Sequence, residues 1–555
     1  MNKLFLLLLL LFFNLNTSAQ GFYLKIIGQN EKETKTIDSI GYQTKHLNTK
    51  SVFDENNIFY EKLTKQGYIE TPSAENYKLN DSTFYFKYSL GKKIKTIHIY
   101  IGNTFKEAIP NNYTIKQDSV YIHYNEAEEF LESVIKNLEK NGFAMAKAKF
   151  SNLQKRKDYL ITQLTVFQEN KRQVNDIIIS GYPNFPKSHK KQLIRNYKNK
   201  VFNQKNIENL YQDIEKFRFA KQIKYPEILF TKDSTKVYVY LEKNKNNSFD
   251  GFIGFTNSET KKLILSGYLD LNLNNILNSG EKLALYWKSN GQSQITFNAN
   301  AEIPYIFKSP LGIKTQLNIF KQDSTFQNTK TAIDLGYYFS YNKKVFLGYQ
   351  ATESSNTQNN ITSTVSDFNN SFTTTTFEFN DFKDDDFLFP EKTYLNARVG
   401  VGKREAKFSN NNQQFGSLTI KHNFYINPKN IINLSSQNYY LKSVNYFINE
   451  LERFGGAKSI RGFNENTLQG NTFSSLLTEY RYVLSSNTYV HTITDFGFIK
   501  DNTSNTQNKL LGIGLGFGFL SKNGLFNIMY ANGSTDKQSV KLSNSIVHIS
   551  FKAVF

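Results

Sequence analysis

From about residue 248 to its C-terminus, the chain is a series of alternating segments of about ten residues separated by turn residues. The last segment shows the pattern most clearly. One face carries Val547, Ile549, Phe551, Ala553 and Phe555, and the other carries His548, Ser550 and Lys552. A strand that is apolar on one face and polar on the other suits lipid outside and a wet lumen inside. At roughly 19 residues per strand and loop, residues 248–555 predict an antiparallel transmembrane barrel of about 16 strands.

A glycine-rich strand lies within this barrel region. Residues 512–519 read GIGLGFGF, with the apolar residues on one face and four glycines on the other. The strict period of two, with no helix following, argues against a nucleotide-binding glycine loop. A strand whose inner face is bare glycine predicts room for a bulky group in the lumen.

The first residues have the features of an export signal. Lys3 is followed by the apolar run Leu4–Phe13 and by the small residues Thr17-Ser18-Ala19. A run of about ten residues is too short to span a bilayer. We therefore predict a signal peptide over 1–19, cleaved after Ala19; the alternative is a short membrane-anchoring helix.

Composition supports the same class of protein. The chain has no cysteine, which excludes disulfides and thiolate metal sites, and no later segment offers 18 consecutive apolar residues. The 34 Tyr and 48 Phe are typical of the aromatic girdles of bacterial outer-membrane barrels. We expect the cell outer membrane as the location.

Residues 20–245 follow a different pattern, in which helices alternate with strands. Helical stretches are predicted at Ser51–Lys65, Asn125–Lys140 and Asn203–Phe217, each followed by alternating strands. Units that recur every 70–75 residues indicate a repeated small α+β module. We place three modules at 20–95, 96–172 and 173–245, and the barrel at 248–555.

The net charge of +20 is compatible with several partners. Because the lysines are dispersed and the chain is exported, we expect no nucleic acid partner, and anionic lipid headgroups or acidic clients account better for the charge. A merely solvated basic surface is the alternative. The seven histidines show no metal-ligand spacing and no G-x-S-x-G motif occurs, so we predict no enzyme activity, no metal and no cofactor.

One loop in the barrel region does not alternate. Residues 454–465 read FGGAKSIRGFNE, with Gly455, Gly456 and Gly462 around an arginine framed by Ile460 and Phe463. Counting strands back from the C-terminus places this loop, about 443–470, on the side of the long extracellular loops. Its apolar residues indicate instead that it folds into the lumen.

An arginine inside a lumen needs a partner, because an unpaired charge with reduced hydration is costly. On the next two strands, the predicted inward faces carry Glu479 and Asp495, and Gly497 leaves space beside Asp495. Either carboxylate could bind the planar guanidinium of Arg461 with two hydrogen bonds and hold the loop against the wall.

These motifs together resemble the outer-membrane assembly and secretion superfamily that includes BamA, TamA and the two-partner secretion transporters. Ile460-Arg461-Gly462-Phe463 matches the (I/V)RG(F/Y) tip of the family's inward loop, and Asp495-Phe496-Gly497 matches its D-x-G element. The modules resemble POTRA domains, and the terminal Phe555 resembles the family's targeting signal. NNILNSGEKL (274–283) resembles its NxxGxGE-type pattern, with Asn278-Ser279 replacing the first glycine.

The resemblance implies the roles of these residues. In that family the loop arginine contacts the D-x-G aspartate, which implies an Arg461–Asp495 pair. It also implies a lateral seam between the first strand, about Phe249–Asn257, and the last, Val547–Phe555, through which client strands enter the lipid. Without a nucleotide site, client folding would supply the energy.

Three modules and this length are closest to TamA-like members, which assemble outer-membrane proteins. The expected partners are unfolded outer-membrane or secreted clients, outer-membrane lipids, and a periplasm-spanning or inner-membrane protein. Two alternatives stay open. One is a two-partner secretion transporter that exports one dedicated protein, and the other is a passive pore.

Overall fold

The computed structural model describes residues 21–102, 105–257, 263–290, 294–357, 365–383, 386–407, 409–541, 543 and 545–555. The predicted signal peptide at 1–19 lies outside these residues. The chain divides into two compact units. The first unit ends at Gln173 and also includes Val201–Lys205, and the second comprises Val174–Lys200 and Asn206–Phe555.

The first module is a four-stranded sheet, in the order β2-β1-β4-β3, packed against two helices. Its elements are β1 (Phe22–Gly28), α2 (Glu31–Ile40), β2 (Lys45–His46), α3 (Thr49–Lys65), β3 (Glu75–Asn80) and β4 (Thr83–Tyr88). Asn30 and Asn48 cap the two helices by accepting hydrogen bonds from backbone N–H groups. Val52, Phe59 and Leu63 form the buried face of α3, which closes the core of the sheet.

The second module is a five-stranded sheet in the order β6-β7-β5-β9-β8. Its elements are β5 (Thr96–Tyr100), η1 (Lys106–Ala108), β6 (Ile115–Lys116), β7 (Ser119–His123), η2 (Tyr124–Glu126), α4 (Ala127–Lys140), β8 (Lys147–Arg156) and β9 (Tyr159–Phe167). Phe130, Val134 and Leu138 bury one face of α4 against the sheet. Gly142, at φ 101°, follows the end of this helix in the conformation that glycine favours.

The third module belongs to the same compact unit as the barrel, apart from the short segment 201–205. It comprises β10 (Asp176–Ser180), α5 (Lys187–Tyr197), α6 (Gln204–Glu215), β11 (Ala220–Gln222), β12 (Glu227–Phe230) and β13 (Thr235–Lys243). Strand β13 pairs in parallel with β10 and antiparallel with β11 and β12.

The three helices predicted from sequence correspond to α3, α4 and α6, but the described residues also contain α2 and α5, which the prediction missed. Helix α2 buries only Ile37 and therefore has no apolar stripe. The buried face of α5 includes His189 and Gln192 beside Leu193 and Tyr197, so its pattern reads as polar.

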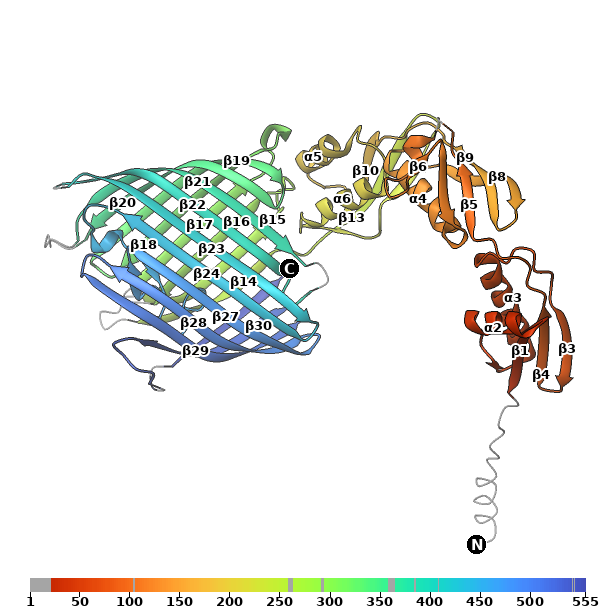
Figure 1. The fold of residues 1–555 in the computed structure, drawn as a ribbon. Helices are drawn as coiled ribbons and strands as arrows, with labels where there is room; N and C mark the ends of the chain where they lie inside the picture. Colours follow the sequence, from red (N-terminus) through yellow and green to blue (C-terminus); the bar gives the residue numbers. More distant parts are fainter. Residues whose placement is uncertain are drawn as a thin grey trace, which may run out of the picture. The chain divides into compact units, whose positions relative to one another are not determined.

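The rest of the chain forms a closed barrel of sixteen antiparallel strands, which confirms the predicted fold class (Figure 1). The strands are β14 (Ser248–Asn257), β15 (Leu263–Asn274), β16 (Lys282–Asn290), β17 (Gln294–Ile303), β18 (Leu311–Gln322), β19 (Phe326–Ser340), β20 (Lys343–Asn356), β21 (Phe368–Phe382), β22 (Glu391–Ala406), β23 (Asn411–Asn427), β24 (Asn430–Lys442), β27 (Thr472–Ser485), β28 (Thr488–Asp501), β29 (Thr506–Ser521), β30 (Gly524–Thr535) and β31 (Ile546–Val554).

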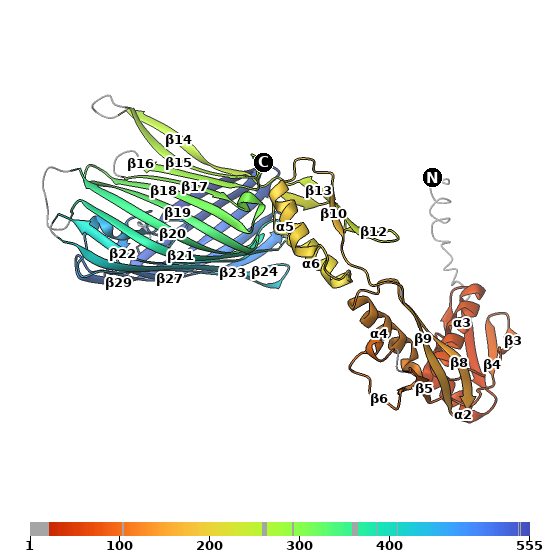
Figure 2. The ribbon, with the colours of Figure 1, turned by 90° about the horizontal axis from the view of Figure 1, so that it is seen from above.

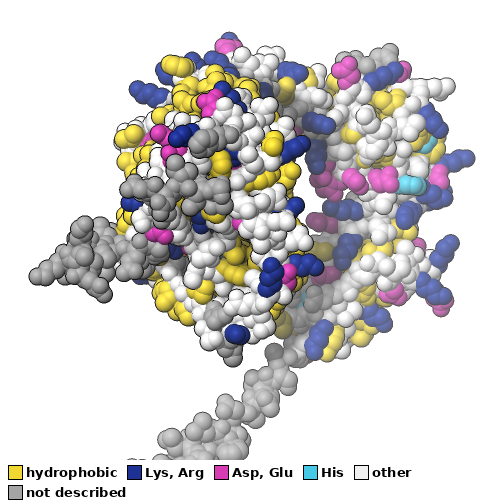
Figure 3. Space-filling view, turned by 90° about the vertical axis from the view of Figure 1, so that its left-hand side faces the viewer, with side chains coloured by type: hydrophobic (Ala, Val, Ile, Leu, Met, Phe, Trp, Pro, Cys, Tyr) yellow, Lys and Arg dark blue, Asp and Glu magenta, His cyan; other side chains and the backbone are white. Residues whose placement is uncertain are grey.

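The outer wall of the barrel is apolar and the inner wall is polar. On β19, Ile333, Leu335 and Phe339 are more than half exposed on the outside, whereas Asp334 is 1% exposed because it faces the lumen. Figure 3 looks at the barrel from one end and shows hydrophobic side chains along parts of its margin. This alternation suits a membrane around the barrel. Within the described part of the chain, no helix has both the length and the apolar character needed to cross a bilayer.

Candidate functional site in the barrel lumen

The segment between β24 and β27, residues 443–471, is here called the inward loop. It contains η4 (Ile448–Glu450) and a small hairpin of β25 (Glu452–Phe454) and β26 (Leu468–Gly470). Gly455, Gly456 and Gly462 have φ values of 105°, 96° and 84°, a region that residues with a side chain rarely adopt. These glycines let the chain turn sharply between the two strands of the hairpin and carry Arg461 to the barrel wall.

Arg461 is bound by Asp495 of β28 through three hydrogen bonds. Its Nε donates to Oδ2 at 2.8 Å, its Nη2 donates to Oδ1 at 2.5 Å, and its backbone N–H donates to Oδ2 at 3.0 Å. The Arg461 side chain is 4% exposed and that of Asp495 is 0% exposed. Because burial strengthens a charge-assisted bond and makes an unpaired partner costly, this pair fixes the position of the loop tip.

Glu479 of β27 completes the site. It accepts a hydrogen bond from Nη1 of Arg461, and it also accepts one from Nε of Arg481 at 2.7 Å. Arg481 in turn donates to the amide oxygen of Asn423 at 3.0 Å. The structure thus brings Asp495 and Glu479 together on one guanidinium, so the two candidate partners act jointly rather than as alternatives.

Glycines on the barrel wall make room for the loop. A Cβ at Gly512 would lie 2.4 Å from the backbone oxygen of Arg461, and one at Gly497 would lie 2.8 Å from Cδ1 of Ile460. Gly462 of the loop meets the backbone of Gly533 on β30 in the same way. The bare face of residues 512–519 therefore accommodates a loop backbone at Gly512.

Apolar residues of the loop pack into a small core inside the barrel. Ile460 is fully buried against Phe473, Leu477, Ile499 and Leu510. The ring of Phe454 stacks on that of Phe473 with their centroids 3.7 Å apart, and Phe463 packs against the same cluster. Ile460 and Phe463, which frame Arg461 in the sequence, therefore pack against the barrel wall on either side of it.

A second buried ion pair holds the beginning of the loop, and sequence reasoning missed it. Arg404 of β22 donates from Nη1 to Oε2 of Glu450 at 2.5 Å, and both side chains are almost fully buried. The guanidinium carbon of Arg404 also lies 4.1 Å from the ring centroid of Phe447. The sequence features that could have predicted this pair are an arginine at an inward position of a strand, Arg404, and an acidic residue in the loop, Glu450.

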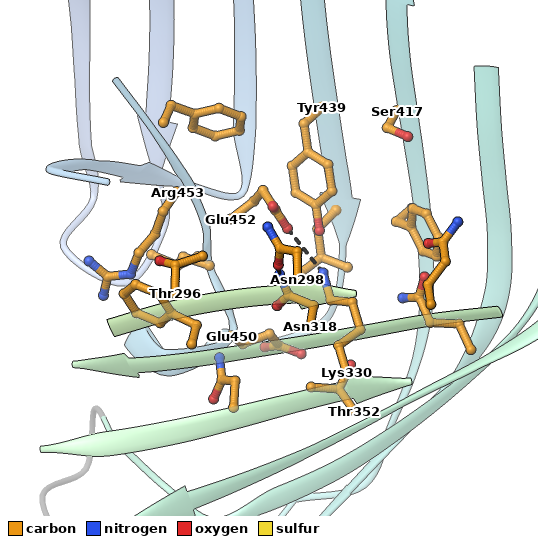
Figure 4. Close-up of a pocket in the computed structure, with 18 of the residues that line it drawn as sticks. Thr296, Asn298, Asn318, Lys330, Thr352, Ser417, Tyr439, Glu450, Glu452 and Arg453 are labelled. Atoms are coloured by element: carbon orange, nitrogen blue, oxygen red, sulfur yellow. Dashed lines mark hydrogen bonds and ion pairs between the residues drawn. The ribbon is translucent and has the colours of Figure 1, made fainter. Parts of the chain in front are cut away.

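Between the loop and the wall of β16–β24 lies a cavity of about 600 Å³ (Figure 4). Amide side chains, including those of Asn298, Asn300, Gln316 and Asn318, line much of it. Nζ of Lys330, on β19, lies 3.4 Å from Oε2 of Glu452 on the loop hairpin. This ion pair ties the hairpin to the wall that lies away from the first and last strands.

The first and last strands close the barrel over a short length. Among the described residues of β14 and β31, the register pairs only Ser248 with Val554 and Phe249 with Ala553. Beyond these pairs, the carboxylate of Asp250 accepts a hydrogen bond from the backbone N–H of Phe551 at 3.3 Å. In contrast, β28 and β29 pair along their whole lengths. Figure 2 shows β14 and β15 diverging from the neighbouring wall, so the weak point of the barrel is at the predicted seam.

The predicted seam residues face outward on β31 and just after it. Val547, Ile549, Phe551 and Phe555 are 43–58% exposed. Phe555 follows β31, and its backbone exchanges hydrogen bonds with that of Asn247 at 3.0 and 3.3 Å. The pairing of β14 with β31 is therefore firm only at the end of the barrel where the chain terminates.

Helix α5 of the third module docks on three turns of the barrel. His189 is fully buried among the rings of Phe185, Phe217, Phe219, Tyr305 and Tyr341, and it contacts Gly280 in the β15–β16 turn. The Gln192 amide donates to the backbone oxygens of Lys308 and Ser309 at 2.8 and 2.9 Å. The polar face of α5 therefore contacts the barrel turns, with Gln192 bonded to turn carbonyls and His189 enclosed by aromatic rings.

The β15–β16 turn is the segment NNILNSGEKL. Asn278, at the position of the family's first glycine, has φ 57°, so asparagine supplies the left-handed conformation there. Glu281 accepts hydrogen bonds from the backbone N–H groups of Leu277 and Ser279, and Asn275 donates to the hydroxyl of Tyr182 at 2.9 Å. These hydrogen bonds hold the turn, which is part of the contact with the third module.

The contacts around Arg461 hold the inward loop on the barrel wall. Nδ1 of His491 lies 3.9 Å from Oε2 of Glu479, beyond hydrogen-bond distance. Within the described residues, no group of three or more His, Cys, Asp or Glu side chains could hold a metal ion. What the geometry provides is a buried anchor, a polar lumen and a weakly closed seam.

Comparison with known proteins gives no match to any family model, and none to a curated sequence. Solved structures do match. CdiB from Acinetobacter baumannii has 13% identity and a TM-score of 0.53, covering 91% of this chain and 98% of that one. CdiB from Escherichia coli has 12% identity and a TM-score of 0.50, covering 91% and 97%. BamA from Haemophilus ducreyi lacking POTRA domains 1–3 has 13% identity and a TM-score of 0.46, covering 78% and 93%.

The match to CdiB spans both the modules and the barrel, since it covers nearly all of each chain. At this identity, the likeness concerns the fold. In this chain Arg461 lies on the inward loop, Asp495 on the barrel wall and Gly280 at the contact with the third module. The chain therefore has a fold like that of the CdiB structures, with small α+β modules in front of a closed 16-stranded barrel.

Proposed function

We propose that this protein is an assembly or translocation factor of the outer membrane. Its three modules lie in the periplasm and capture unfolded client strands, and its barrel inserts or exports them through the seam between β14 and β31. The partners are outer-membrane or secreted clients, membrane lipids and a periplasm-spanning or inner-membrane protein. No enzyme activity, metal or cofactor takes part.

The seam is the observation that carries this proposal. A closed barrel normally removes sheet edges, because every strand is paired on both sides. Here β31 has a full partner in β30 but pairs with β14 only at Ser248 and Phe249 among the described residues. Separating so short a ladder exposes the backbone groups of β14 and β31, and a client strand can pair with them while its apolar face enters the lipid.

The modules supply edges of the same kind. Strand β3 lies at the edge of the first sheet, and all six of its residues are exposed. An exposed edge strand offers free backbone donors and acceptors to an extended chain of almost any sequence. Such binding suits a factor whose clients share a β conformation rather than a sequence.

A disulfide across the seam tests the proposal. The chain has no cysteine, so Phe249→Cys with Ala553→Cys introduces the only pair, at positions that face each other in the register. We expect oxidation to stop client insertion and a reductant to restore it, with each single-cysteine variant as the control. Normal insertion by the fully oxidised variant would contradict the lateral route.

The clients are identified by depleting the protein and comparing outer-membrane proteomes. Broad loss of barrel proteins is expected. Loss of a single exported protein would instead support dedicated secretion, and no loss would support a passive pore. Arg461→Ala and Asp495→Ala, tested in the same assay, are expected to reduce client levels while the barrel itself stays inserted, because they release the loop without breaking the sheet.

A further inference from the structure

The inward loop contacts the barrel on both sides of the seam. On the side of the last strands, Arg461 binds Asp495 of β28, and Gly462 lies against Gly533 of β30. On the side of the first strands, Lys458 forms an ion pair with Asp270 of β15. The loop therefore spans the inside of the seam.

Glu465 makes a second attachment to the first strands. It accepts a hydrogen bond from the Tyr286 hydroxyl at 2.8 Å and forms an ion pair with Lys288, both on β16. Nζ of Lys458 also lies 4.9 Å from the ring centroid of Tyr286. The two attachments thus converge on one patch of β15 and β16.

This patch lies at the level where the seam loses its backbone pairing. Asp270 is opposite Asp250 in the β14–β15 register and opposite Tyr286 in the β15–β16 register. Asp250 is the residue whose carboxylate reaches the backbone of Phe551 on β31. The loop therefore bridges the seam just beyond its last paired residues.

The two ends of this bridge differ in burial. Arg461 and Asp495 are 4% and 0% exposed, whereas Lys458 and Asp270 are 76% and 23% exposed and Lys288 and Glu465 are 37% and 29% exposed. Removing one partner of a buried pair is strongly destabilising, but solvated ion pairs are weak and screened by salt. One end of the loop is thus fixed, and the other can detach.

We infer that the inward loop is a releasable strap that holds the seam closed from inside. Lys458 and Glu465 are positioning residues that keep β15 and β16, and with them β14, next to β28–β31. Their release lets the first strands swing away while Arg461 keeps the loop on the opposite wall. The strap rests on the proposed function, since it has a role only if the seam opens.

The test uses spin labels on the full-length protein in outer-membrane vesicles. Leu269→Cys on β15 and Val547→Cys on β31 place labels on the outer wall on either side of the seam, away from the loop. We expect Lys458→Met or Glu465→Gln to raise the population of long distances roughly fivefold each, and the double variant to raise it further. High salt is expected to raise it in the parent protein but not in the double variant.

Lys330→Met is the matched control. It removes an ion pair of similar exposure between the same loop and β19, on the wall away from the seam, and is expected to leave the distances unchanged. Lys458→Asp is expected to open the seam, and adding Asp270→Lys to close it again, because the reversed charges still attract. Unchanged distances in the strap variants, or equal opening by Lys330→Met, would overturn the strap.

Failure of the strap and failure of the proposed function are distinguishable. If the oxidised seam disulfide blocks client insertion but the strap variants leave the label distances unchanged, the strap alone is wrong. If the strap variants open the seam while the oxidised disulfide permits insertion, the strap holds and the lateral route is wrong.

Discussion

The barrel meets its neighbours at two joints, and they are built differently. At the joint with the third module, α5 is held by a ring cage around His189 and by the Gln192 amide, which donates to two turn carbonyls. At the seam, β14 and β31 share two register pairs and one side-chain hydrogen bond among the described residues. The contrast indicates a rigid module–barrel body whose freedom is concentrated at the seam.

The two joints are also connected through the same strands. The turns that receive α5 belong to β15–β16, β17–β18 and β19–β20, which follow the first strand of the barrel. A force on the third module therefore acts on the strands that follow β14. The strands on the other side of the seam are held to the inward loop by Arg461. We therefore expect substitutions in the module joint to change the free energy of α5 docking strongly. Substitutions at the seam should change the free energy of separating β14 from β31 only slightly.

The strongest test of the rigid joint is Gly280→Ala. Gly280 has φ 79°, and a Cβ there would lie 1.9 Å from Cε1 of His189. Strained backbone and overpacking together should weaken docking of α5 by about 3 kcal/mol. Hydrogen exchange over residues 187–197 measures this as faster opening.

Gly416→Ala is the matched control, because nothing lies within 4 Å of a Cβ at that strand position. It is expected to leave exchange in α5 unchanged. Slow exchange in Gly280→Ala would mean that the cage is loose, and the contrast between the two joints would then disappear.

The joint is also expected to depend on pH. Burial in the ring cage, with Lys282 nearby, lowers the pKa of His189 from 6.5 to about 3. Because the docked histidine stays neutral, docking is fully stable above pH 6.5 and weakens as pH falls toward 3, by about 2 kcal/mol at pH 5. Exchange over α5, corrected for its intrinsic pH dependence, should show the change between pH 7.5 and pH 5.

His189→Leu fills the cage with an apolar side chain and removes the titrating group. We expect its α5 exchange, after the same correction, to be independent of pH over this range. If exchange in this variant still depended on pH, the pH dependence of α5 docking would come from another group and not from His189.

Much of the barrel and its anchor could be predicted from the sequence, because strand faces follow directly from a period of two. The two strands predicted after the inward loop are β27 and β28, and their inward faces carry Glu479 and Asp495. The alternation does not show which of the two carboxylates binds the Arg461 guanidinium. In the folded barrel, the guanidinium binds both.

Other features depend on contacts between segments far apart in the chain. Arg404 meets Glu450, and Lys458 meets Asp270, because the loop folds across the lumen, and no local pattern encodes which strands it reaches. Helix α5 was missed for the same reason, since its buried face is polar where it bonds to the barrel turns.

The smallest expected effect is at the seam itself. Asp250→Ala removes the acceptor for the Phe551 backbone N–H across the seam, a long hydrogen bond of 3.3 Å, and also the acceptor for the Tyr268 hydroxyl within the β14–β15 pair. Its loss should cost about 0.5–1 kcal/mol and raise the open population, measured with labels at positions 269 and 547, roughly two- to fivefold. Asp250→Asn keeps an acceptor oxygen and is expected to stay close to the parent protein. An effect as large as that of Gly280→Ala would show that the seam is a strong joint, because a single side chain would then hold as much free energy as the docked helix.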